Sequence, residues 1–129
     1  MATRKQLSVT MDNAPGRLAI MGDAFAAKNV NILAFMSIAH EGRSLVRMIV
    51  DNVPVAKKAL QGVGYAYTEE QVLGTKLANR PGTLARIAKR LGDAGVNIAY
   101  AYLGAEPRSL QQLVVLSVSD FDRAKRLIK

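Results

Sequence analysis

The chain has 129 residues, of which 50% are hydrophobic, and it carries a formal net charge of +8. The hydrophobic content is that of a globular protein and excludes a disordered chain, and the absence of cysteine excludes disulfides and thiolate metal sites. No apolar run approaches the roughly 18 residues of a membrane span, and the first residues form no apolar signal-peptide core. We therefore expect a cytoplasmic protein without membrane contact.

The basic charge raises the prospect of an anionic partner, including nucleic acid. The Lys and Arg residues are spread over both halves of the chain. This spread favours the alternative interpretation, a solvated basic surface.

The chain repeats itself: eight residues of the first half recur 66 positions later. The pairs are Asn13 and Asn79, Pro15 and Pro81, Gly16 and Gly82, Leu18 and Leu84, Ala19 and Ala85, Val30 and Val96, Asn31 and Asn97, and Ile32 and Ile98. Further downstream the match needs a shift of two residues, which falls in 104–110, a Gly- and Pro-containing stretch typical of a hairpin loop. The period is that of a small domain, so we expect two domains, residues 1–70 and 71–129. A unit this small is marginally stable alone, so we expect the copies to pack on each other or in a homodimer.

Apolar residues at alternating or helical spacing predict the same elements in both copies. The first copy is predicted to contain a strand over 7–12, a helix after Pro15-Gly16, strands over 31–39 and 44–50, a helix from Pro54 with Ala56, Ala59 and Leu60 inward, and a weak strand over 65–68. In its first helix Leu18, Met21 and Phe25 recur at helical spacing, and Asn29 is expected to end the helix, with Gly95 in its place in the second copy. The second copy is predicted to contain a strand over 71–78, a helix over 82–94, strands over 97–103 and 111–119, and a helix over 122–128.

This order is the split βαβ, or ferredoxin-like, unit, in which both helices lie on one face of an antiparallel sheet. We therefore expect an α+β fold of two tandem βαββαβ units, joined by a charged linker at Glu69-Glu70. The second unit lacks its last strand, either naturally or because the sequence is truncated.

The apolar residues of the second strand occupy both of its faces. If Ile32, Ala34 and Met36 face the helices, Leu33 and Phe35 point away from them. A sheet with two apolar faces is usually covered on both. We expect the second face to be buried by sheet packing between chains or by a sheet continued across the copies.

The turn before the first helix of each copy is the candidate binding motif. It reads Asp-Asn-Ala-Pro-Gly-Arg-Leu over 12–18 and Ala-Asn-Arg-Pro-Gly-Thr-Leu over 78–84. Gly16 and Gly82 let the backbone approach a ligand closely, and the N–H groups of a helix start attract anions such as a carboxylate. The alternative interpretation is structural: Pro and Gly make a tight turn, and Asn13 or Asn79 caps the helix.

Asn31 and Asn97 open the second strand of each copy, at the opposite end of the helix from that turn. A ligand that touches both features would therefore bridge two units. The alternative is that each Asn bonds the end of the preceding helix.

Together, the Asn-Xaa-Pro-Gly-Xaa-Leu turn, the amphipathic helix and the Val-Asn-Ile strand resemble the ACT domain, a small regulatory module of amino-acid metabolism. The whole chain resembles stand-alone tandem ACT proteins and, more distantly, the regulatory subunits of acetolactate synthase. The resemblance implies that an amino acid binds between paired units. The implied ligand-binding residues are Asn13, Ala14, Gly16, Arg17, Leu18, Asn31, Ile32, Asn79, Arg80, Gly82, Thr83, Leu84, Asn97 and Ile98. Asp12 becomes Ala78 in the second copy, so the two sites are expected to be unequal.

Catalytic, metal and cofactor sites have no support in the sequence. The single His40 lies in a predicted hairpin turn, and with no cysteine no Cys–His or Ser–His pair is visible. Nucleic-acid binding has some basis, because the RNA-recognition module shares this element order. That module stacks bases on aromatics of its third strand, which neither 44–50 nor 111–117 contains, whereas Tyr100 and Tyr102 lie on the second strand.

We therefore expect a non-catalytic amino-acid sensor that reports to a partner protein. The alternatives are a regulatory subunit of an amino-acid biosynthetic enzyme and a basic nucleic-acid-binding protein, for which Arg86, Lys89 and Arg90 on one helix face would contact phosphates.

Overall fold

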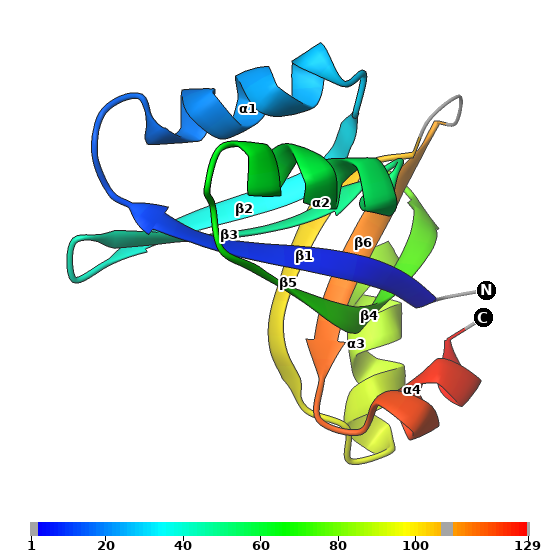
Figure 1. Ribbon diagram of the computed structural model, residues 1–129. Helices are drawn as coiled ribbons and strands as arrows, with labels where there is room; N and C mark the ends of the chain where they lie inside the picture. The colour runs from blue at the N-terminus through cyan, green and yellow to red at the C-terminus, as the bar shows by residue number, and fades with distance from the viewer. Residues whose placement is uncertain (1–2, 107–109, 129) are drawn as a thin grey trace. The chain divides into compact units, whose positions relative to one another are not determined.

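The computed structural model describes residues 3–106 and 110–128 (Figure 1). The chain forms two compact units. Lys5–Glu70 makes up the first unit, and the described residues from Gln71 onward make up the second together with Thr3 and Arg4. Each unit has its own hydrophobic core.

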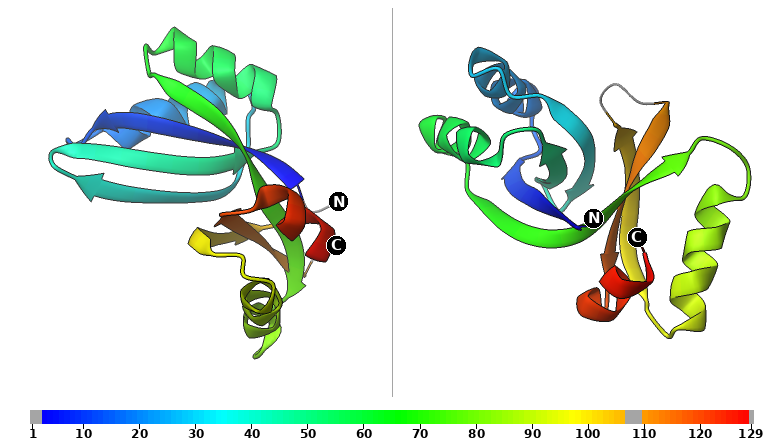
Figure 2. Two further views of the ribbon diagram at one scale, coloured as in Figure 1. Left: turned by 90° about the horizontal axis from the view of Figure 1, so that it is seen from below. Right: turned by 90° about the vertical axis from the view of Figure 1, so that its right-hand side faces the viewer.

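The first unit is an antiparallel sheet with two helices on one face (Figures 1 and 2). Its elements are β1 (Thr3–Asp12), α1 (Arg17–Ala27), β2 (Ile32–His40), β3 (Arg43–Val50), α2 (Val53–Gly62) and the first residues of β4 (Tyr67–Ala78). β3 pairs with β1 and with β2. Glu70 at the start of β4 accepts hydrogen bonds from the side chains of Gln6 and Ser8, so β4 begins beside β1. This is the predicted split βαβ arrangement.

The first core lies between the sheet and the two helices. Met21 and Phe25 come from α1, while α2 contributes Ala56, Ala59 and Leu60, as their helical spacing predicted. They pack onto the strand residues Leu7, Val9, Val46, Met48 and Val50. Asn29, which follows α1, adopts the left-handed conformation with φ of 58°, and its repeat counterpart Gly95 does so with φ of 76°. Both were predicted to end a helix.

The second unit repeats this arrangement. Its elements are the rest of β4, α3 (Thr83–Asp93), β5 (Ile98–Ala105), β6 (Gln111–Val118) and α4 (Phe121–Leu127). β6 pairs antiparallel with β4 and β5. The core is formed by Leu73, Leu91, Val96, Val114, Leu116, Ala124 and Ile128. The predicted hairpin loop joins β5 to β6, but its residues 107–109 lie outside the described residues, and no strand follows α4 within 110–128. The α+β fold of two ferredoxin-like units is therefore confirmed.

The predicted charged linker between the copies is wrong. β4 runs without a break through Glu69 and Glu70, so the weak strand predicted over 65–68 and the strand predicted over 71–78 belong to one element. Lys57 on α2 forms an ion pair with Glu69, and Arg47 Nη1 on β3 lies 3.5 Å from Glu70 Oε1. Because each carboxylate has a cationic neighbour, the two charges are compatible with an extended strand.

The predicted faces of β2 are wrong beyond its first residue. Ile32 pairs with Val50, but the register shifts between Ile32 and Ala34, so that Phe35 pairs with Met48. Directly paired residues share a face, and Met48 is in the core beneath the helices. Phe35 therefore lies on the helix side, and Ala34 lies on the other side. One extra residue in a bulge reverses the alternation, which a regular pattern cannot anticipate.

The sheet faces away from the helices are buried in part, in the direction that their apolar character predicted, whereas Ile38 on this face of the first unit is 52% exposed. Ile49 in the first unit and Leu113 and Val115 in the second are each at most 2% exposed, and none belongs to either helix-side core. β5 carries the same bulge as β2, between Ile98 and Tyr100. The duplication therefore extends to an irregularity of the backbone.

Candidate functional site

The turn before the first helix of each unit is built around a left-handed glycine. Gly16 and Gly82 are the N-cap residues of α1 and α3, with φ of 85° and 90°, and neither helix has a side-chain cap. The Asn13 N–H donates to the Gly42 carbonyl (2.9 Å), and its Oδ1 accepts from Ser44 Oγ (3.1 Å). Asn13 therefore fastens the turn to the β2–β3 hairpin, and the alternative interpretation, in which it caps the helix, is wrong.

The uncapped helix start leaves backbone donors available. In α1 the first bond of the helical ladder runs from the Ile20 N–H to the Gly16 carbonyl (3.1 Å), which leaves the N–H groups of Leu18 and Ala19 without an intrahelical acceptor. Neither α1 nor α3 has an acidic residue in its first turn. Each turn therefore presents free N–H groups at the positive end of a helix dipole, where a carboxylate is stabilised.

The two turns differ in their chemistry. In the first, Asp12 forms an ion pair with Arg43, and the Tyr65 hydroxyl donates to the Arg17 carbonyl (2.8 Å). In the second, Thr83 replaces Arg17, and its Oγ1 lies 2.9 Å from the Ala78 carbonyl oxygen and 2.6 Å from the Arg80 carbonyl oxygen. A hydroxyl that bonds its own turn is less available to a ligand. The expectation of unequal sites stays a prediction, with this difference as its structural basis.

Asn31 lies at the other end of the first unit from the turn. Its N–H donates to Asp51 Oδ1 (2.9 Å), and the Asp51 N–H donates to its carbonyl (3.1 Å). These bonds do not reach α1, so the interpretation that Asn31 bonds the preceding helix end is wrong. The whole length of β3 separates Asp51 from Gly42, beside which Asn13 lies, a span of roughly 25 Å at about 3.3 Å per residue.

The second unit has the same separation. The Asn97 N–H donates to Ser119 Oγ (2.9 Å), beyond the end of β6 that is remote from the turn. The two predicted halves of a ligand site therefore do not meet within one unit. This agrees with the prediction that a ligand touching both halves would have to bridge two units.

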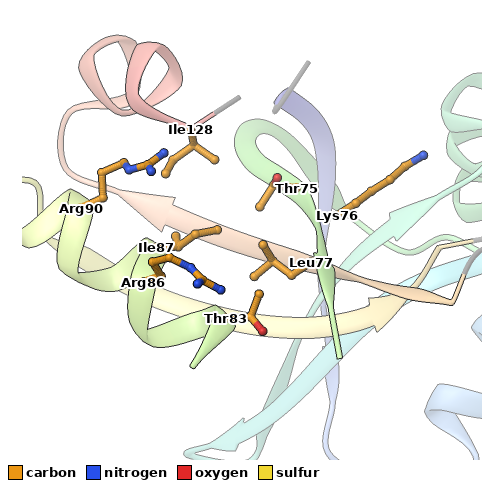
Figure 3. A pocket seen from close by; sticks show the side chains of 8 residues that line it. All are labelled: Thr75, Lys76, Leu77, Thr83, Arg86, Ile87, Arg90 and Ile128. Atoms are coloured by element: carbon orange, nitrogen blue, oxygen red, sulfur yellow. The ribbon is translucent and has the colours of Figure 1, made fainter. Parts of the chain in front are cut away.

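Each unit has a hollow beside its turn, and few of the predicted residues line it. In the first unit a hollow of about 240 Å³ is lined by Arg17 together with Asp12, Arg43 and Tyr65. In the second unit a hollow of about 190 Å³ is lined by Thr83 and by Arg86 and Arg90 of α3 (Figure 3). The sequence drew attention to these arginines as a basic helix face, but it contained no signal that they border a hollow.

Groups for acid–base or metal chemistry are not gathered in the part of the chain that the structure describes. No cluster of metal-ligating side chains occurs among residues 3–106 and 110–128. His40 is exposed beside Glu41, with 3.7 Å between Nε2 and Oε1. A hydrogen bond between Lys57 and Glu69 raises the pKa of the lysine and lowers the pKa of the glutamate, but this pair joins α2 to β4. Among the described residues, no helix is long and apolar enough to span a bilayer.

Comparison with known proteins finds similarity in sequence and in fold. A family model described as the ACT domain matches residues 71–129. The solved structure of protein BT0572 from Bacteroides thetaiotaomicron is 30% identical, with a TM-score of 0.87 over 98% of this chain and 86% of that chain. The ligand-free regulatory subunit of aspartate kinase from Thermus thermophilus shares the fold at 17% identity, with a TM-score of 0.68 over 98% of this chain and 88% of that chain. The corresponding subunit from Thermus flavus shares it at 16% identity, with a TM-score of 0.60 over 98% and 94%. No curated protein matches the sequence.

Proposed function

The chain belongs to the ACT domain family, and we propose that it is a non-catalytic sensor that binds a free amino acid at its glycine-capped turns. ACT domains have a regulatory, small-molecule-binding role, and the family model covers the second unit. The first unit repeats its fold and its turn. The specific ligand class and the position of the site are the parts we propose.

The observation that carries the proposal is the pair of uncapped helix starts. Gly16 and Gly82 have no side chain to obstruct a ligand, and no atom lies within 4 Å of the Cβ that either would carry. The carboxylate of an amino acid would accept hydrogen bonds from the free N–H groups beyond each glycine. Asn31 and Ile32, or Asn97 and Ile98, of a neighbouring unit would contact the rest of the ligand, because they lie too far away within their own unit.

A ligand held by two units acts by differential affinity. It stabilises the arrangement of units in which both sets of contacts form, and a partner that distinguishes this arrangement reads the signal. We propose that the chain works as a homodimer, which light scattering with and without ligand would test.

The second candidate function is that of a regulatory subunit with an obligate catalytic partner. The aspartate kinase regulatory subunits from two Thermus species share this fold, which favours a partner in amino-acid biosynthesis. Stable co-purification with one large enzyme would support this function over a free-standing sensor. The third interpretation is nucleic-acid binding. It predicts that the protein binds RNA with an affinity that falls steeply as the salt concentration rises.

The deciding experiment is thermal unfolding in the presence of each of the twenty amino acids at low and high salt. A ligand at about 100 times its Kd stabilises the folded state by roughly 2.7 kcal/mol, which corresponds to a shift of several degrees. We expect a response to one amino acid or a few related ones. The response should weaken in Gly16→Ala or Gly82→Ala and persist in the matched helix variant Gly22→Ala. No response to any amino acid would contradict the proposed ligand class.

A further inference from the structure

The second unit contains a groove between β4, α3 and the end of α4, which we call the β4–α3 groove (Figure 3). Its volume is about 190 Å³, and Leu77, Ile87 and Ile128 give it an apolar floor. The complete lining is Thr75, Lys76, Leu77, Thr83, Arg86, Ile87, Arg90 and Ile128. All of these residues belong to one unit, so the groove does not depend on how the units are arranged.

The corresponding place in the first unit is a hollow of about 240 Å³ that Met11, Arg17 and Tyr65 border. Leu77 matches Met11 in the repeat, and Met11 is only 4% exposed. Tyr65, in the segment that follows α2, packs against the first core, and its hydroxyl donates to the Arg17 carbonyl. Both units therefore have a hollow at this place, and they differ in charge: Asp12 lines that of the first unit, whereas no acidic residue lines that of the second.

The second copy also places polar groups where the first copy has apolar ones. Thr75 stands at the position of Val9, a core residue of the first unit, and Arg86 stands at the position of Ile20. Thr75 is only 8% exposed and lines the groove, where its hydroxyl can donate a hydrogen bond to a ligand or accept one from it.

The rim of the groove is cationic. Arg86 has no hydrogen-bond or ion-pair partner in the described part of the chain. Arg90 donates from Nη1 to the Leu127 carbonyl (3.2 Å), which leaves its other guanidinium donors available. Lys76 extends away from the groove (Figure 3), with its Nζ 3.9 Å from Glu106 Oε1. No Asp or Glu occurs among the residues that line the groove.

We propose that the β4–α3 groove binds a small aromatic carboxylic acid. The ring lies on the floor of Leu77, Ile87 and Ile128, and the carboxylate bonds Arg86 and Arg90. An apolar cavity of about 150 Å³ is large enough for benzene, so the groove can take one ring while the acid stays at the rim. Paired N–H donors of Arg favour a carboxylate over a neutral polar group. This site is separate from the proposed amino-acid site and does not rest on it.

The test is an NMR titration of the full chain with 3-phenylpropionate, and with 3-phenylpropionamide as its neutral counterpart. We expect saturable shifts of the methyl signals of Thr75, Ile87 and Ile128, with the amide binding at least tenfold more weakly. Arg86→Gln should raise the Kd for the acid at least tenfold. Arg126→Gln is the matched control, because Arg126 is an exposed cation of the same unit that does not line the groove, and it should leave the Kd unchanged.

Thr75→Val keeps the side-chain volume and restores the residue of the first copy, so the protein should stay folded while the acid binds more weakly. Equal affinity for the acid and the amide would overturn the proposal, as would an unchanged Kd in Arg86→Gln. Shifts confined to 79–82 or 13–16 would also overturn it and would instead indicate the turns. Phenylalanine and tyrosine are themselves aromatic carboxylic acids, so Arg86→Gln assigns a thermal response to either of them: a response from the groove is lost in this variant, and one from the turns is kept.

Discussion

Replacement of Gly16 by alanine tests whether the turn requires the left-handed backbone. Gly16 has φ of +85°, and an added Cβ would meet nothing within 4 Å. The cost is therefore conformational rather than steric: a residue with a Cβ loses roughly 1–2 kcal/mol in the left-handed region. We expect Gly16→Ala to lower the free energy of unfolding by about that amount.

The assay is urea or thermal unfolding beside a matched substitution in the same helix. At about 2.1 cal/mol/K per residue, a chain of 129 residues that unfolds cooperatively loses about 4 °C in Tm per kcal/mol. Gly22 lies inside α1 with open space at its Cβ and an ordinary helical backbone. Gly22→Ala should therefore stabilise by roughly 0.5–1 kcal/mol. If the two variants change stability in the same direction, the argument from the left-handed conformation is refuted.

Three further predictions concern packing, charge and capping. Phe25→Ala should cost roughly 3–5 kcal/mol in urea unfolding because Phe25 is 1% exposed, whereas Phe35→Ala should cost less than about 1 kcal/mol because Phe35 is 47% exposed; similar costs would contradict the assignment of the core. The Lys57–Glu69 hydrogen bond raises the pKa of Lys57 and lowers that of Glu69, so its contribution is complete between roughly pH 5 and pH 10 and is lost outside that window. Lys57→Met removes this pair, so the difference in free energy of unfolding between wild type and the variant should shrink as the pH falls toward 2. A difference that stays constant with pH would contradict this. Asp120→Ala removes the side chain that accepts from the Arg123 N–H and should cost about 1 kcal/mol, seen as faster amide exchange in α4; unchanged exchange would show that the cap is dispensable.

The repeat and the element order could be predicted because they rest on local properties of the chain. Apolar spacing predicted that Ala56 and Ala59 would face the core, since a helix returns to the same side every 3.6 residues. Asn29 and Gly95 were predicted to end helices because few other residues tolerate the left-handed conformation. Gly16 and Gly82, the glycines of the two turns, also adopt the left-handed conformation. This part of the candidate site could therefore be named from its residue types alone.

Features that depend on neighbours distant in sequence could not be predicted. The bulge in β2 is a property of its pairing with β3, and it moved Phe35 to the opposite face from the one expected. Glu69 and Glu70 resembled a solvated linker because their partners, Lys57 and Arg47, are recognisable only once α2 and β3 lie beside β4.

The sequence by itself determined the duplicated order of strands and helices and the glycine-capped turns, because these depend on the conformational preferences of neighbouring residues. Only the tertiary structure decided the role of Asn13, whose N–H donates a hydrogen bond to the Gly42 carbonyl in the β2–β3 hairpin and whose side chain does not cap α1. It alone decided that Thr75 and Arg86 border an open groove. A groove is a space between elements, and its existence depends on how the side chains of β4, α3 and Ile128 pack, a property that no local pattern of residues encodes.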